Sequence, residues 1–180
     1  MLKKVALVVM ALALAAIAPV AAQNPRFNNL EIRLMWATTV TPPDLRCEGG
    51  EPTGLPFPQC SEGTKHVVGR NEVQTWWPVP VPFEGSVPDE LNGPITFVVN
   101  CNLSADYRGP CWGTFRWELS EDVHWEGTWT APVMDLVTYE ARMSMVGHGV
   151  GGEIDGMQIK FDGASEPPEN WFVIGSVRIH

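Results

Sequence analysis

The sequence predicts an all-β protein that forms a single antiparallel β-barrel of about eight strands, with a β-sandwich as the alternative. Apolar and polar residues alternate with a period of two in several separate segments, which is the pattern of half-buried strands. Beyond the first 22 residues, no segment of helical length has apolar residues at i, i+3, i+4 and i+7 without an intervening glycine or proline. Turn signals separate the segments at short intervals, as in sandwiches and barrels.

The N-terminal half predicts extended elements separated by a long loop. Residues 30–36 alternate between apolar and mostly polar side chains and predict a half-buried first strand. The proline- and glycine-rich loop over 42–63 is too long for a simple turn, so we expect a disulfide to keep it compact. Residues 65–77 predict a pair of extended segments around Gly69. Prolines at every second position over 78–82 predict polyproline-like structure or an edge strand, because proline has no backbone donor.

The C-terminal half predicts the remaining strands and their turns. Two of them, 112–119 and 124–132, are expected to pair across a turn at 120–123. The glycine-rich run 147–152 predicts a bulged bend or a hairpin end rather than strand interior, because glycine has no side chain to pack. Glycines at corners favour a barrel, since sharp strand curvature needs them. The other predicted strands are 95–101, 136–146 and 171–179, with Met157, Ile159 and Phe161 as the inward residues of one more.

The first 22 residues have the pattern of a secretory signal peptide. Lys3 and Lys4 precede an apolar run over 5–20, and the small residues at 20–22 form a cleavage site. A membrane anchor is the alternative, but the run is shorter than the roughly 20 residues that a spanning helix needs. We therefore expect a signal peptide at 1–22, one mature domain at 23–180, and a secreted or periplasmic protein that does not span the membrane.

Four cysteines follow the signal peptide, an even number that predicts disulfides in an exported chain. Three connectivities are open, and the pairs with the shortest loops, Cys47–Cys60 and Cys101–Cys111, are the natural expectation. The second pair brackets a turn-rich segment between two apolar strands, so its bridge would close the base of a hairpin. A zinc site is disfavoured because the chain has no closely spaced C-x2-C pair.

The charge of the chain excludes one class of partner. The sequence has 12 Lys and Arg against 21 Asp and Glu, and its net charge of −9 becomes −11 when Lys3 and Lys4 leave with the signal peptide. Nucleic-acid binding needs a basic surface, so we expect no nucleic-acid partner. The acidic residues occur singly or in pairs, as on a well-solvated surface.

Two stretches carry a resemblance to a known superfamily. The segment 125–129, Trp-Glu-Gly-Thr-Trp, and the glycine-rich segment 147–156 resemble the small secreted barrels related to allene oxide cyclase and plant dirigent proteins. The resemblance covers about a third of the chain and implies the barrel fold and a homotrimeric assembly. It implies no catalytic residue, because none of the active-site motifs of those families matches here. The two cysteine loops and the proline run depart from the pattern.

His148 is the leading candidate for a functional residue. It stands between Gly147 and Gly149, where an imidazole is expected to be accessible and can act as a base or a ligand. Asp155 or Glu126 would complete an acid–base pair with it. The alternative is that His148 is a polar residue at a loop tip with no further role.

His124 and Glu126 stand two apart on a predicted strand and therefore point to the same face. Together with His148 and Glu153 they are candidates for a metal site with nitrogen and oxygen ligands. The alternative follows from the alternation, which turns Trp125 inward and leaves His124 and Glu126 facing solvent. We favour the alternative, and we expect no cofactor.

Tryptophan is frequent, with eight residues in the chain. Trp76 and Trp77 are adjacent and should point to opposite faces, so at least one of them is expected to be exposed. An exposed ring there, or at Trp171, would stack on a sugar or on a proline-rich partner. The alternative use is cover for the core, as is usual for tryptophan. Those that fall in phase with the inward alternation are expected in the core: Trp36, Trp117, Trp125 and Trp129.

Two functions compete on these observations. The first is a non-enzymatic exported barrel that binds a small apolar or carbohydrate ligand or a protein partner. The second is a lyase, isomerase or hydrolase that uses His148 with Asp155 or Glu126 at the barrel mouth. We favour the first, because a barrel of this size either fills with side chains or holds one small ligand. A purely structural role is a third interpretation.

Overall fold

The computed structural model describes residues 27–53, 59–61, 63–81, 85–138, 140–165 and 172–180. The predicted signal peptide, Pro82 and Trp171 lie outside this part of the chain. Apart from two 3-10 turns, η1 (Asp89–Leu91) and η2 (Gly152–Ile154), the regular elements are strands. Within the described ranges, no helix has the length and apolar character needed to cross a membrane.

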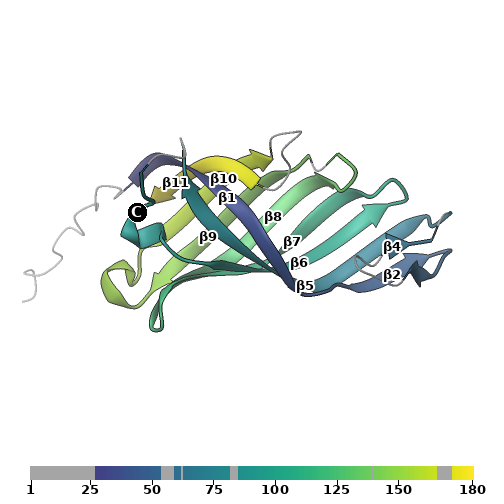
Figure 1. Cartoon of the computed structure of the whole chain (residues 1–180), viewed down its shortest axis with the longest axis horizontal. Helices are drawn as coiled ribbons and strands as arrows, with labels where there is room; N and C mark the ends of the chain where they lie inside the picture. The colour runs from purple at the N-terminus through teal and green to yellow at the C-terminus, as the bar shows by residue number, and fades with distance from the viewer. Residues whose placement is uncertain (1–26, 54–58, 62, 82–84, 139, 166–171) are drawn as a thin grey trace, which may run out of the picture.

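Eight antiparallel strands close into a barrel, which confirms the predicted barrel rather than the sandwich. Around the wall the order is β1-β11-β10-β9-β8-β7-β6-β5, and β5 then pairs with β1. Figure 1 shows β5 to β8 side by side as a curved sheet, with the other four strands completing the wall. The barrel strands are β1 (Phe27–Thr41), β5 (His66–Pro80), β6 (Ile95–Ser104), β7 (Arg108–Ser120), β8 (Val123–Asp135), β9 (Arg142–Val150), β10 (Gln158–Ser165) and β11 (Phe172–Ile179).

The long loop expected over 42–63 contains three short strands, so that expectation was wrong in part. β2 (Asp44–Glu48) pairs with the first half of β5 and lies outside the closed wall. β3 (Pro52–Thr53) pairs with β4 (Gln59–Cys60). The disulfide Cys47–Cys60 joins β2 to β4, so the bridge predicted to compact the loop also holds its hairpin. Figure 1 shows β2 and β4 at the end of the molecule opposite the C-terminus.

β5 is one strand with a bulge rather than two segments. Its pairing with β6 shifts between Gly69 and Glu72. The pairing with β6 ends at Trp76, whereas Pro78 and Pro80 are paired with β1 alone. The proline stretch is therefore an edge on one side, as predicted, because proline has no backbone N–H to donate to a ladder.

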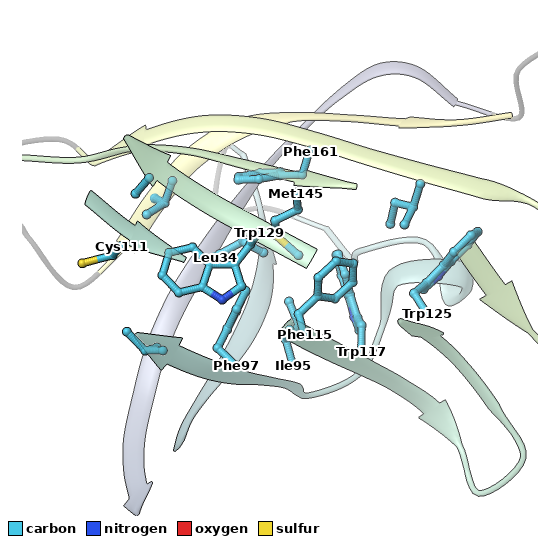
Figure 2. Close-up of a cluster of buried hydrophobic side chains, with 14 of the residues drawn as sticks. Leu34, Ile95, Phe97, Cys111, Phe115, Trp117, Trp125, Trp129, Met145 and Phe161 are labelled. Carbon is cyan, nitrogen blue, oxygen red and sulfur yellow. The ribbon is translucent and has the colours of Figure 1, made fainter. Parts of the chain in front are cut away.

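Large side chains fill the barrel interior, and Figure 2 shows them converging from opposite walls. Phe97 packs edge-on against Trp129, with ring centroids 5.9 Å apart. The predicted core tryptophans of β7 and β8 are confirmed, whereas Trp36 is only half-buried. The largest fully buried side chains are Trp117, Trp125, Phe97, Phe161, Ile32, Leu34, Leu91, Ile95 and Met145.

Two of these tryptophans also hold the 3-10 turn η1 against one end of the barrel. Trp117 Nε1 donates to the carbonyl of Leu91 at 3.1 Å, and Trp125 Nε1 donates to the carbonyl of Glu90 at 2.8 Å. Leu91 is completely buried. The turn therefore closes this end, and both indole donors are satisfied, as buried tryptophan requires.

Residues 147–149 lie inside β9, so the prediction of a bend at that point was wrong. Gly147 pairs with Gly127 of β8. A Cβ on Gly147 would lie 2.7 Å from Cζ of Phe115 and 2.4 Å from a carbonyl oxygen of β8. The glycine is needed because a ring from another strand occupies the space of its side chain. The chain bends only afterwards, at 151–152, where φ is 75° and 57°.

Both predicted disulfides are present, Cys47–Cys60 and Cys101–Cys111. Cys101 and Cys111 are directly opposite in β6 and β7, so the second bridge joins the two strands of a hairpin as expected. Disulfides form and persist in oxidising compartments. The two bridges therefore indicate an oxidising environment for the protein.

Candidate functional site

The candidate residues of β8 and β9 lie on the outer wall of the barrel. Trp125 and Trp129 of β8 are buried in the core, so Glu126 and Thr128 between them face outward. Glu126 is directly opposite His148 of β9. His148 therefore lies on the barrel wall rather than at a loop tip or in the barrel mouth, where sequence reasoning had placed it.

Glu126 contacts two imidazoles. Its Oε1 lies 3.5 Å from Nε2 of His148, and its Oε2 lies 3.3 Å from Nε2 of His124. Arg116 of β7 lies 3.0 Å from the same nitrogen of His124 and donates from Nε to Glu118 at 3.2 Å. We call these five residues the wall cluster: Arg116, Glu118, His124, Glu126 and His148.

The two histidines of the wall cluster differ in exposure. His124 is 7% exposed, and its Nδ1 is buried without a hydrogen-bond partner in the described part of the chain. The side chain of His148 is 58% exposed. His148 is thus the imidazole that a ligand can reach, whereas His124 lies against the far oxygen of Glu126 and shares its Nε2 with Arg116.

A groove runs along the outer wall beside the wall cluster. Two depressions, of about 410 and about 570 Å³, share Gly127, Thr128 and His148 in their linings. The first extends over β6 and β7, where Arg116 lines it. The second extends towards β10 and β11. We call the two together the outer-wall groove; its remaining polar lining residues are Thr96, Thr114, Glu126, Gln158, Lys160, Arg178 and His180.

At the end of the groove that extends towards β10 and β11, Asp162 of β10 neutralises the charges of Lys160 and Arg178. This carboxylate lies 3.1 Å from Lys160 Nζ and 2.6 Å from a guanidinium nitrogen of Arg178, and Ser144 donates to it at 2.8 Å. Partial burial raises the pKa of Asp162, but hydrogen bonds from Ser144, Lys160 and Arg178 outweigh it and hold the pKa below its ordinary value. Asp162 is therefore held as a carboxylate that neutralises cations lining this end of the groove.

Asp155 and Glu153 lie after β9, at the turn, and not opposite His148. Asp155 accepts a hydrogen bond from the backbone N–H of Gly151 at 3.2 Å, which closes the turn. Glu153 lies in η2. In the described ranges, no three His, Cys, Asp or Glu side chains are grouped closely enough to hold a metal ion, which is what a centre at His124, His148 and Glu153 would require.

The adjacent tryptophans of β5 point to opposite faces, as predicted. Trp76 packs inside, edge-on against Phe97 at 6.0 Å, and its Nε1 donates to Gln74 at 2.9 Å. Trp77 is 44% exposed and pairs with Met35 of β1. This exposed ring lies on the β1–β5 wall and does not line the outer-wall groove.

Sequence reasoning missed Arg116 and the groove itself. Alternation with Trp117 gave an outward direction for Arg116, but its place opposite Glu126 could not be counted from the turn at 120–123, because a bulge between Glu118 and Ser120 shifts the register by one residue. The groove had no comparable signal, because it depends on which strands become neighbours.

Searches of protein-family models, curated proteins and solved structures found no match to this chain. The class of protein is therefore defined by the fold and the site: a disulfide-bonded, closed antiparallel β-barrel with a filled interior and a polar groove on its outer wall. The resemblance to allene oxide cyclase and dirigent barrels stays a prediction.

Proposed function

We propose that this chain is an exported binding protein whose ligand site is the outer-wall groove. The observation that carries the proposal is the contrast between the two sides of the wall. The interior is occupied by fully buried aromatic and aliphatic side chains, whereas the outside is hollowed beside a set of hydrogen-bonding side chains. Ligand sites are concave surfaces with a few converging polar groups, and this description fits the groove.

The compartment supports the same proposal. Two disulfides suit a secreted or periplasmic protein, and the N-terminal pattern of the sequence suits export. An exported binding protein meets its ligand outside the cytoplasm. A disulfide-bonded barrel with a filled core is a stable support for such a site.

The test is a fragment screen by NMR on the chain without its predicted signal peptide. Mixtures of small neutral, anionic and cationic polar compounds are added, and backbone amide shifts are followed. We expect the shifts to concentrate at Thr128, His148 and Gln158. Thr128→Trp should fill the groove and abolish them, whereas Val133→Trp, at another exposed position of β8, should not. Shifts confined to inward residues such as Phe97, or no shifts at all, would contradict the proposal.

A second candidate function is acid–base catalysis by His148 and Glu126. The observation in its favour is the 3.5 Å contact between an exposed imidazole and a carboxylate whose other oxygen lies 3.3 Å from His124. Such a pair can move a proton to or from a bound substrate, which fits a lyase, isomerase or hydrolase.

Turnover of p-nitrophenyl glycosides and esters tests this candidate. Catalysis by the pair predicts that His148→Asn and Glu126→Gln each remove the turnover, and that Glu118→Gln retains it. Turnover that survives both substitutions, or no turnover of any of these compounds, would contradict hydrolysis by this pair.

A further inference from the structure

We propose that the ligand of the outer-wall groove is a neutral oligosaccharide that lies across the strands. This inference rests on the proposed function and adds the chemical class of the ligand. It is argued from the register of side chains on the wall, from their charge pairing and from one exposed tryptophan.

A row of hydrogen-bonding side chains crosses five neighbouring strands and follows the curve of the barrel wall. The pairing places Thr96 opposite Arg116, Arg116 opposite Glu126, Glu126 opposite His148, and His148 opposite Gln158. Neighbouring strands lie about 4.8 Å apart, so the row is roughly 19 Å long. A single small molecule contacts only part of such a row, whereas a chain of several sugar rings can contact all of it.

A second row of shorter side chains runs beside the first and forms the low part of the groove. It consists of Val98, Thr114, Thr128 and Val146, which are opposite one another in consecutive strands. Because these side chains are short, their apolar surface and hydroxyl groups lie closer to the backbone than the ends of the longer side chains in the first row. A sugar ring has hydroxyls at its edge and apolar C–H groups on its faces, so it matches a polar rim above a mostly apolar floor.

Trp112 lies beside the second row along the wall, next to the residues that line the two depressions and not among them. It lies two residues before Thr114 on the same face of β7, opposite Thr130 of β8, and it is 44% exposed. A partly exposed tryptophan combines a large apolar face with a polar N–H. Its ring is therefore placed to stack on the C–H face of a sugar whose hydroxyls contact the hydrogen-bonding side chains of the first row.

The charges along the groove are paired, which favours a neutral ligand. Arg116 is paired with Glu118, Asp162 holds both Lys160 and Arg178, and Glu126 lies between two histidines. Neither sign is in large excess, so a polyanion or a polycation gains little from this surface. The ionised groups still form strong hydrogen bonds, and adjacent hydroxyls of a sugar provide donors and acceptors for them.

The test is calorimetric titration of the chain, without its predicted signal peptide, with neutral hexasaccharides and their monosaccharides. The probes are the β-1,4-linked hexamers of glucose, xylose and N-acetylglucosamine and the α-1,4-linked hexamer of glucose. We expect at least one hexamer to bind and its monosaccharide to bind far more weakly, because only the hexamer spans the row.

Variants connect this binding to the groove. Glu126→Gln keeps the shape of the side chain but removes its charge, and Trp112→Ala removes the stacking face. Each substitution should weaken the affinity for the hexamer by about tenfold or more. Trp77→Ala, which changes an equally exposed tryptophan on another wall, is the matched control and should bind like the parent chain. Thermal unfolding of each variant checks that it is folded.

The outcomes separate this inference from the function on which it rests. If no neutral oligosaccharide binds, or if binding is unaffected by both Glu126→Gln and Trp112→Ala, the inference is overturned. Should an anionic polysaccharide or a peptide bind in the groove instead, the ligand class is wrong while a groove-binding function stands. Failure of every fragment and oligosaccharide to perturb Thr128 and His148 would overturn both.

Discussion

Glu126 and His148 are directly opposite each other in β8 and β9, with Oε1 and Nε2 3.5 Å apart on the outer wall of the barrel. The second oxygen of the same carboxylate contacts His124, which is buried. One carboxylate thus lies between an imidazole that solvent reaches and one that it barely reaches. These contacts orient the Glu126 carboxylate on the outer wall through residues of β8 and β9.

Gly147→Ala should destabilise the protein. The new Cβ would lie 2.4 Å from the Glu126 carbonyl oxygen and 2.7 Å from Phe115 Cζ, and overpacking of this kind costs about 1–3 kcal/mol. Gly69→Ala is the control, because its nearest neighbours would be at 3.7 and 3.8 Å, an ordinary contact. Urea unfolding compares the two, and equal stability of both variants would show that the wall at Gly147 can relax.

Trp117→Phe and Trp125→Phe should each lower the free energy of unfolding by about 1–3 kcal/mol, because each removes a donor from a carbonyl of η1 and leaves a smaller ring. Since both tryptophans hold the same turn, the double variant is expected to lose less than the sum of the two. Trp112→Phe, on the exposed wall, is the matched control and should be nearly neutral. Chemical denaturation followed by far-UV circular dichroism measures all four variants.

The two disulfides should stabilise different parts of the molecule. Cys101 and Cys111 join two barrel strands, so replacing both with alanine should lower global stability by about 2–3 kcal/mol. Cys47 and Cys60 hold β2 to the β3–β4 hairpin, outside the closed wall. Their replacement should speed amide hydrogen exchange mainly over β2, β3 and β4, with the barrel amides still protected. Equal loss of protection throughout the barrel would contradict this division.

Asp162→Asn should show a pH-dependent loss of stability. Because the pKa of Asp162 in the folded chain lies below its ordinary value of 3.8, the carboxylate adds stability above that pH and loses it as pH falls through the folded value. The variant should therefore be less stable at pH 7, by about 0.5–1 kcal/mol for a partly exposed ion pair. It should approach the parent chain only once the pH has fallen below the pKa of Asp162 in the folded chain.

The matched control for this prediction is Asp122→Asn, in the exposed β7–β8 turn. Denaturant unfolding at several pH values measures both variants. A stability difference between parent chain and Asp162→Asn that grows towards low pH would mean that the hydrogen bonds to Asp162 do not favour its ionised form.

Local pattern was enough to predict much of the fold. The alternation in 112–119 and 124–132 predicted the β7–β8 hairpin, and the spacing of four cysteines predicted both bridges. The error at 147–150 has a clear cause. Glycine is disfavoured within strands by its local properties, but here Phe115 from β7 fills the space where a side chain would stand, and nothing in the neighbouring sequence of β9 reveals that ring.

The candidate site was predictable in part. His124 and Glu126 were expected to line the solvent face together, because residues two apart share a face of a strand. They do share a face and contact each other, but His124 is only 7% exposed, so the expectation that it faces solvent was wrong. The partner of His148 was left open between Asp155 and Glu126. Asp155 instead closes the turn after β9, and Glu126 is the carboxylate that contacts His148.

By itself, the sequence determined which side chains face the core and which face outward, because alternation along a strand is a local property of the extended backbone. It also favoured the barrel over a sandwich and the two short cysteine loops over the other connectivities, and the structure has the barrel and both of these disulfides. Only the tertiary structure decided which outward residues became neighbours. The row from Thr96 to Gln158 exists because four strand pairings have matching registers, and register depends on hydrogen bonds and packing between segments far apart in the chain.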